Sequence, residues 1–274
     1  GRQNWFDYAA QEHKAVREDV GLFDQSSFAK FVLKGRDAKN TLQIICSNNV
    51  DVEPGTVVYT AMLNSSGGIE ADVTVTRISE EEFWIFTGAA TSNRTFNWIK
   101  TNTPHESNVF LYDITSSYGV IGLMGPKSRA LLKKLTGDEL SSQQYPFRSS
   151  SEFEIGYATV RATRITYVGE LGWELQIPSE FMVNVYESIV SEGDNFNLRH
   201  AGYHAMESLR IEKAYRSWGH DITPLETPLE AGLGFAVDFD KEVNFIGRDA
   251  LMKQLENGLS QRMAVFTMSD SEPY

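Results

Sequence analysis

The chain alternates between apolar and polar residues over positions 69–76, directly after a short polar turn. Within the stretch GIEADVTVTRI the odd positions from 69 to 75 are apolar and the even positions from 70 to 76 are polar. A period of two is typical of a strand that buries one face. The preceding stretch GTVVYTAML is also strand-like, and the sequence SSGG at 65–68 predicts a tight turn between the two. We therefore expect an antiparallel hairpin over 55–78.

The polar face of the second predicted strand contains a carboxylate, Asp72, and Thr74 follows two residues later on the same face. Aspartate is depleted in strands. Asp72 is therefore either a solvated residue on an outer face or a functional carboxylate held in place by the sheet. The spacing alone favours the solvated interpretation.

Similar patterns divide the rest of the chain into short helices and strands. Helix-like patterns cover 8–20, 36–48, 90–103, 127–137, 179–193, 201–216 and 247–258. Strand-like patterns cover 22–35, 81–89, 109–115, 118–125, the hairpin 157–178 and the segment from 261. The irregular alternation and the hairpins predict an α+β fold with antiparallel sheets and flanking helices, and not a doubly wound parallel fold. Neither a G-x-G-x-x-G nor a Walker motif occurs, so no dinucleotide-binding or P-loop segment is predicted.

The second predicted hairpin contains the motif RITYVGELGWEL. Tyr167 precedes the turn GELG, and Glu174 follows it. Such an aromatic ring and carboxylate would clamp a flat heterocycle, with Tyr167 stacking and Glu174 accepting two parallel N–H bonds from a ring amide and amine. The alternative is an ordinary hairpin with a partly buried tyrosine and a solvated glutamate. Spacing alone favours the ordinary hairpin.

The predicted helix over 201–216 offers two ion pairs. Glu207 and Arg210 are three residues apart, and Glu212 and Arg216 are four apart. We expect this helix to end near Trp218. Arg210 lies among apolar positions, so its guanidinium needs a partner, which is either Glu207 or a ligand carboxylate.

The composition is that of an ordinary globular protein with excess negative charge. The 274 residues are 41% hydrophobic, and 25 basic against 37 acidic residues give a net charge of −12. Because an acidic chain repels phosphate backbones, we expect no nucleic-acid partner. We expect no membrane partner either, since no apolar run approaches the roughly 18 residues of a spanning helix.

The single cysteine, Cys46, excludes an internal disulfide and fits a reducing compartment. It lies in the apolar run LQIICS, so we expect it to be buried rather than reactive. No metal site is predicted: His200 and His204 have the spacing of one helix face, but no third ligand accompanies them. The chain opens with a polar, helix-like segment and no signal peptide, and its first residue, Gly1, is expected of a processed chain or an excised piece.

Several stretches occur together in an order that resembles a known family. They are AVREDVGLFDQSSFAKFVLKG, GGIEADVTV, TYVGELGWEL, ESLRIEKAYRSWGHDITPLETPLEAGL and NFIGRDAL. Together they resemble the folate-binding aminomethyltransferases, the family of the glycine cleavage T-protein, over nearly the whole chain. The segments GRQNWF and IEKAYRSWGHDITPLETPLEAGL are most similar to the tetrahydrofolate-binding half of the dimethylglycine and sarcosine dehydrogenases. A related branch, the regulatory subunit of pyruvate dehydrogenase phosphatase, is not known as a catalyst.

The resemblance implies roles for residues of the first hairpin and the strand after it. Asp72 matches the acid that family members place next to the reactive folate nitrogens, and Thr74 shares its face. Tyr59 matches a tyrosine that contacts folate. Gly88 takes the place of an asparagine common in T-proteins, as it does in the dehydrogenase branch, so a backbone contact is implied there.

The resemblance also implies binding roles in the second half of the chain. Tyr167 and Glu174 match residues that hold the pteridine. Arg210 matches an arginine near the folate site, which is a weaker correspondence. The implied ligand is tetrahydrofolate, and FAD is implied only on a domain absent from this chain.

The implied activity is one-carbon transfer in a flavin-dependent N-methyl amine dehydrogenase. The flavin half of such an enzyme oxidises the amine, and tetrahydrofolate captures the iminium carbon as 5,10-methylenetetrahydrofolate. Positions 1–258 would form the folate domain, and 259–274 would begin a truncated C-terminal β domain. The implied partners are folate, an N-methyl amine or iminium, and a flavin-binding domain, in a bacterial cytoplasm or a mitochondrial matrix. The alternatives are a stand-alone aminomethyltransferase or methyltransferase and a non-catalytic regulatory module.

Overall fold

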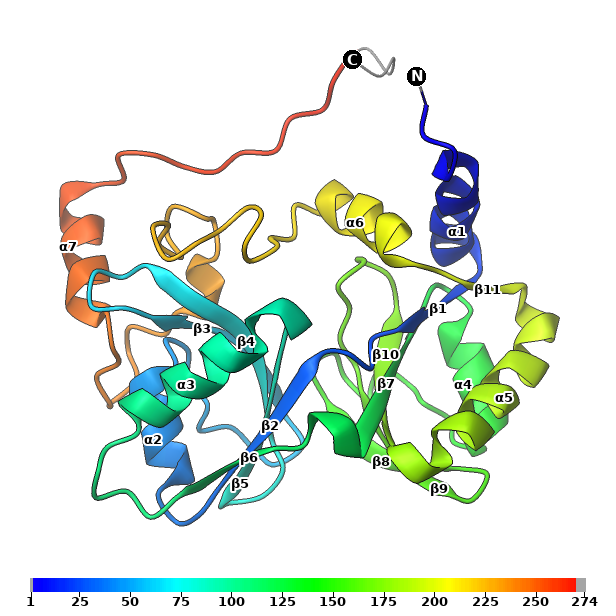
Figure 1. Ribbon diagram of the computed structural model, residues 1–274, viewed down its shortest axis with the longest axis horizontal. Helices are drawn as coiled ribbons and strands as arrows, with labels where there is room; N and C mark the ends of the chain where they lie inside the picture. The colour runs from blue at the N-terminus through cyan, green and yellow to red at the C-terminus, as the bar shows by residue number, and fades with distance from the viewer. Residues whose placement is uncertain (1, 270–274) are drawn as a thin grey trace. The chain divides into compact units, whose positions relative to one another are not determined.

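The computed structural model describes residues 2–269, which form two compact units (Figure 1). Within the described chain, unit 1 contains residues 2–26, 116–215 and 264–269, and unit 2 contains residues 27–115 and 216–263. Because the chain passes from one unit to the other and back, neither unit is a continuous stretch of sequence.

Unit 1 is built on a six-stranded sheet with the strand order β11-β1-β7-β10-β9-β8. Its strands are β1 (Val20–Asp24), β7 (Tyr118–Met124), β8 (Ser150–Ile155), β9 (Ala158–Thr163), β10 (Gly172–Pro178) and β11 (Leu198–His200). Its helices are α1 (Phe6–Glu18), α4 (Ser128–Thr136), α5 (Met182–Gly193) and α6 (Tyr203–Glu212). Neighbouring strands are antiparallel except for the edge pair β1 and β11, which is parallel.

The two faces of this sheet bury different sets of side chains. One set includes Trp173 of β10 and packs against α4 and α5 through residues such as Leu131. The other set includes Phe23 and packs against α1 and α6 through Val16 and Leu209. Because successive residues of a strand point to opposite faces, β7 contributes side chains to both layers, Leu123 to the first set and Met124 to the second.

Unit 2 is built on a five-stranded antiparallel sheet with the order β3-β4-β5-β2-β6. Its strands are β2 (Ala29–Lys34), β3 (Val57–Leu63), β4 (Ile69–Arg77), β5 (Glu82–Thr87) and β6 (Phe110–Asp113). Its helices are α2 (Ala38–Ile45), α3 (Ser92–Asn102) and α7 (Arg248–Asn257). Val73 packs in a core with residues of α2 and α3, whereas Ala61 packs with Phe245 and with Leu251 of α7.

The predicted first hairpin is confirmed. Strands β3 and β4 pair in antiparallel fashion, with a bulge between Met62 and Leu63. The backbone N–H groups of Ser66 and Gly68 donate to the side-chain oxygen of Asn64 and close the turn. Gly68 is required here, because a Cβ atom would lie 1.8 Å from the carbonyl oxygen of Pro224.

The predicted α+β fold with mainly antiparallel sheets is confirmed, but several predicted boundaries are wrong. The strand predicted over 22–35 is two strands, β1 in unit 1 and β2 in unit 2, because Asp24 accepts a hydrogen bond from the Ser26 N–H and turns the chain. The first helix ends at Glu18, before the predicted stop. The strand β8 was not predicted.

The helix predicted over 201–216 ends at Glu212, and Ala214 has a positive φ of 56°. The prediction of a shared helix face for His200 and His204 is wrong, since His200 lies in β11 and His204 in α6. Residues 261–269 contain no strand, and the rest of that predicted element, 270–274, lies outside the described residues.

Cys46 is fully buried as predicted, and burial raises the pKa of its thiol to about 12. Within residues 2–269 no helix is long and apolar enough to cross a membrane. No group of three or more His, Cys, Asp or Glu side chains in the same range is arranged to hold a metal ion.

Candidate functional site

The carboxylate of Asp72 lies mid-strand in β4 and is held by a tyrosine of the neighbouring strand. The Tyr59 hydroxyl donates to Asp72 Oδ2 at 3.2 Å. Burial raises the pKa of Asp72, and the hydrogen bonds from Tyr59 and from its own backbone N–H oppose that rise. Asp72 is half-buried on a face that also contains the buried Thr76 and Glu70, so it is not the fully solvated outer-face residue that the spacing favoured.

The tyrosine that holds this carboxylate belongs to a stacked aromatic pair within unit 2. The ring of Tyr59 stacks on that of Phe235, with centroids 5.9 Å apart and planes 25° from parallel. The Phe235 side chain is 72% exposed, which is unusual for a large apolar residue in a stacked pair. Thr74 is half-buried and pairs with Tyr59 in the β3–β4 register. Tyr59 thus connects the half-buried acid to an aromatic pair whose outer ring, Phe235, is exposed.

Gly88 follows β5 and precedes the short 3₁₀ turn η1 (Ala89–Thr91). Its φ of −60° suits any residue, and an added Cβ would meet only Thr91 Oγ1, at 3.8 Å. The hydroxyl of Thr87, just before it, donates to the backbone oxygen of Asp72 at 3.3 Å. The fold therefore does not demand glycine at 88, and the predicted backbone contact with a ligand stays a prediction.

Glu174 lies in β10 of unit 1, opposite Gly122 of β7 and Thr163 of β9. Its side chain is only 6% exposed. Burial raises the pKa of Glu174 to about 7, and a hydrogen bond from the Gln25 amide opposes the rise. The interpretation of Glu174 as a solvated hairpin residue is therefore wrong.

Gln25 is a residue that the sequence reasoning missed. It is 1% exposed, and its Oε1 atom has no hydrogen-bond partner among the described residues. Gly122 leaves the room that Gln25 occupies, since a Cβ at 122 would lie 2.6 Å from Gln25 Oε1. A single glutamine after a strand has no sequence pattern that would reveal this role. Its amide holds Glu174 and leaves an acceptor oxygen beside it.

Tyr167 and Arg210 belong to the same unit as Glu174. The ring of Tyr167 stacks on that of Tyr215, with centroids 6.3 Å apart. Arg210 is 3% exposed, donates to the Tyr215 carbonyl at 2.9 Å and forms an ion pair with Glu207. The predicted Glu207–Arg210 pair is confirmed, so Arg210 positions Tyr215 against Tyr167, and its contact with a ligand stays a prediction.

The second predicted ion pair, between Glu212 and Arg216, is wrong because the helix has ended. Glu212 instead accepts from Arg17 at 2.8 Å, and Arg216 donates to the Ala231 carbonyl at 2.9 Å. The seven predicted residues thus form two groups. Tyr59, Asp72, Thr74 and Gly88 belong to unit 2, and Tyr167, Glu174 and Arg210 belong to unit 1.

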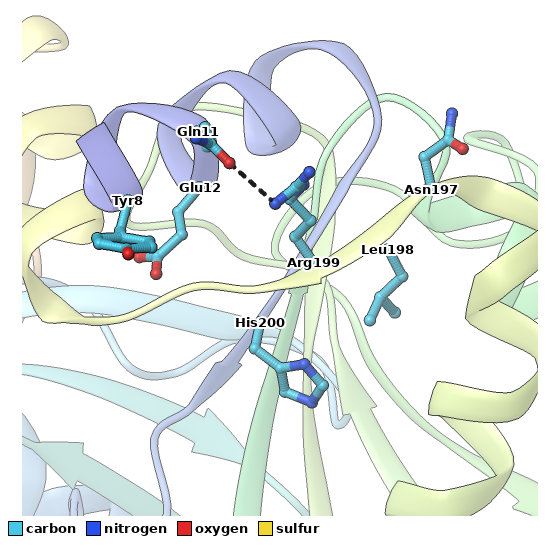
Figure 2. A pocket seen from close by; sticks show the side chains of 7 residues that line it. All are labelled: Tyr8, Gln11, Glu12, Asn197, Leu198, Arg199 and His200. Carbon is cyan, nitrogen blue, oxygen red and sulfur yellow. Dashed lines mark hydrogen bonds between the residues drawn. The ribbon is translucent and has the colours of Figure 1, made fainter.

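A hollow of about 540 Å³ in unit 1 contains none of these residues. It lies beside α1 and β11 and is lined by Tyr8, Gln11, Glu12, Asn197, Leu198, Arg199 and His200 (Figure 2). Its polar groups are already paired: Arg199 donates to Gln11 at 3.3 Å, and Glu12 accepts from the Gly202 N–H at 2.9 Å. We therefore place candidate functional residues around the half-buried Asp72 in unit 2 and around the buried Glu174 in unit 1, and not at this hollow.

Comparison with known proteins identifies the family. The model of the GCVT N-terminal domain matches residues 1–241. The chain belongs to the GCVT aminomethyltransferase family. In agreement, a solved structure of the glycine cleavage aminomethyltransferase T from Bartonella henselae has a TM-score of 0.80 at 25% identity, covering 91% of this chain and 67% of that chain.

The curated relatives of this GCVT-family chain include enzymes and a regulatory subunit. The 4-methylaminobutanoate oxidase (formaldehyde-forming) of Paenarthrobacter nicotinovorans is 39% identical over 273 residues, which cover 100% of this chain and 33% of the relative. The pyruvate dehydrogenase phosphatase regulatory subunit of Mus musculus is 36% identical over 274 residues, which cover 99% of this chain and 31% of the relative. The sarcosine dehydrogenase of Homo sapiens is 37% identical over 281 residues, which cover 97% of this chain and 31% of the relative. The chain thus spans about a third of the length of these relatives.

Proposed function

We propose that the chain is the tetrahydrofolate-binding, one-carbon transfer module of a flavin-dependent N-methyl amine dehydrogenase of the dimethylglycine or sarcosine type. The observation on which this rests is the shielded carboxylate of Asp72, held mid-strand by the Tyr59 hydroxyl at 3.2 Å. Among residues 2–269 no cationic side chain forms an ion pair with this carboxylate, and Tyr59 could pair equally well with a neutral acceptor, so the fold does not require an acid here.

The residues present fit tetrahydrofolate. A pteridine edge offers an amide and an amine N–H, and the buried Glu174 carboxylate with the unpaired Gln25 Oε1 offers acceptors for such donors. The stacked rings of Tyr167 and Tyr215 offer an aromatic surface in the same unit. When bound, tetrahydrofolate supplies the amine nitrogens that accept the one-carbon unit as 5,10-methylenetetrahydrofolate.

The two acids would have different roles. Asp72 would stabilise positive charge that develops at the reacting centre and orient or deprotonate the folate amine, so its effect would fall on the rate. Glu174 and Tyr167 would bind the ring equally in the ground state and the transition state, so their effect would fall on affinity. Further contacts with the bound folate would come from Thr74, Gly88 and Arg210.

Two alternatives use the same fold. A stand-alone aminomethyltransferase or methyltransferase would have no flavin domain in the full-length protein, so the length of the gene discriminates it. A non-catalytic regulatory module would have no need of the acids. The presence of both Asp72 and Glu174 favours the enzyme, although a regulatory subunit is among the relatives.

The test is calorimetric titration of the chain with 5-formyltetrahydrofolate, a stable analogue. We expect saturable binding, abolished by Glu174→Ala and retained in Asp72→Ala. Gln11→Ala, in the hollow of Figure 2, is the matched control and should leave the dissociation constant unchanged. Absence of binding by a protein that includes the flavin and C-terminal domains would overturn the proposal.

A further inference from the structure

Two arginines of unit 1 share one hydroxyl group as their hydrogen-bond acceptor. Arg129 lies in the first turn of α4, and Arg164 follows β9. Arg129 Nη2 donates to Ser142 Oγ at 2.8 Å, and Arg164 Nη2 donates to the same atom at 3.3 Å. Two guanidinium groups therefore converge on one neutral oxygen.

Both guanidinium groups also lie over the buried ring of Trp173. Their Cζ atoms are 5.9 Å (Arg129) and 5.7 Å (Arg164) from the ring centroid. Within residues 2–269 the Nε atoms of both arginines are buried and have no hydrogen-bond partner. The Nε–H and Nη2–H groups form one edge of a guanidinium, which is the edge that binds a carboxylate or phosphate with two parallel hydrogen bonds. Each arginine thus has this edge only half used.

The charges around the pair are unbalanced. Other arginines of unit 1 reach carboxylates: Arg17 pairs with Glu170, and Arg161 pairs with Glu152. In the described part of the chain, no Asp or Glu side chain forms an ion pair with Arg129 or Arg164. Burial, and then the charge of Arg129, lower the pKa of Arg164. Arg129 also lies at the positive end of the α4 dipole, where an anion is favoured and a cation is not.

We propose that Arg129, Arg164 and Ser142 form a binding site for an oxyanion, namely the phosphate or carboxylate group of a ligand. In the structure, Ser142 Oγ occupies the position that one oxygen of the anion would take. The site is separate from the candidate folate residues. Trp173 and Glu174 are consecutive in β10, so they point to opposite faces of the sheet. The proposal does not depend on folate binding.

The direct test is titration of the chain with inorganic phosphate and, separately, with acetate, at an ionic strength held constant with chloride. Heat release or the shift of the two arginine Nε–H signals in NMR reports binding. We expect saturable binding that Arg129→Gln weakens by about tenfold or more. A phosphate response without an acetate response assigns a phosphate ligand, and a response to both assigns oxyanions in general. Absence of any response, or an equal response in Arg129→Gln, overturns the proposal.

A second variant tests the site without removing an arginine. Ser142→Asp places a carboxylate between the two guanidinium groups and should raise the melting temperature by about 2–4 °C while it abolishes phosphate binding. Gln143→Glu adds the same charge at the neighbouring exposed position and is the control. In a chain with a net charge of −12 the control should be neutral or slightly destabilising. If both variants change the melting temperature equally, the arginines do not form an anion site.

Discussion

The Tyr59 hydroxyl donates a hydrogen bond to the Asp72 carboxylate across the β3–β4 pair, at 3.2 Å. This bond stabilises the ionised form of an acid whose pKa is raised by burial. Tyr59→Phe removes the bond and should raise the pKa of Asp72 further. If transfer requires ionised Asp72, the acid limb of its pH–rate profile moves to higher pH in this variant. An unchanged profile would mean that the hydrogen bond does not tune the acid.

Burial of Glu174 gives a stability prediction with a definite sign. Its pKa is about 7 in the folded chain, against 4.5 for the ordinary group. The folded state therefore binds more protons than the unfolded state between these values, and Glu174 lowers the free energy of unfolding as pH rises from 4.5 to 7. Glu174→Gln should match the wild type near pH 4 and exceed its stability by up to about 3 kcal/mol at pH 8. Urea unfolding at both pH values measures this difference, and a constant difference would contradict the account.

The Gln25 amide should set the pH range of ligand binding through Glu174. Gln25→Leu removes a hydrogen bond that opposes the raised pKa of Glu174, so this pKa should rise above about 7. Because a ring amide and amine need an ionised acceptor, the midpoint of 5-formyltetrahydrofolate binding should move to higher pH. Dissociation constants from pH 5.5 to 9 test this. Glu174→Gln is the control, since it has no ionised acceptor and should bind weakly at every pH, and an identical midpoint in Gln25→Leu would exclude the role.

Gly88 should tolerate the asparagine that T-proteins often have. Its φ of −60° and the open space around it mean that Gly88→Asn introduces no strain. We expect a change in the free energy of unfolding within about 0.5 kcal/mol, as for an ordinary surface substitution. The dissociation constant for 5-formyltetrahydrofolate should change by less than about threefold, because the implied contact is made by backbone. A large loss of affinity would show that the side chain, and not the backbone, matters there.

The parts of the fold that could be predicted from sequence are those with a local cause. The hairpin β3–β4 has a clear period of two and a turn that Asn64 closes. The division of 22–35 into two strands also has a local cause that the prediction overlooked: the polar run DQSS at 24–27, where Asp24 accepts a hydrogen bond from the Ser26 N–H, interrupts the two apolar halves. The end of α6 at Glu212 could not be predicted from the sequence, because the chain turns at Ala214, which has a positive φ, and not at a glycine or proline.

The surroundings of the two acids, half-buried Asp72 and buried Glu174, could not be predicted from the sequence for a related reason. Alternation identifies which face of β4 contains Asp72, but it does not show that distant segments cover that face. Likewise, the buried Glu174 has a hydrogen bond with Gln25, which is far away in sequence and has no pattern of its own. The resemblance to the family implied the roles of these two acids, and the structure identified their hydrogen-bond partners.

The most direct test of the central claim is Asp72→Asn, with affinity and rate measured side by side. One arm is the dissociation constant of 5-formyltetrahydrofolate, and the other is the rate of 5,10-methylenetetrahydrofolate formation from an N-methyl amine in the full-length protein. The account predicts a rate loss of about 100-fold or more, with affinity changed by less than about threefold. Equal losses in both, or no loss of rate, would contradict the assignment of Asp72 as the residue that promotes transfer.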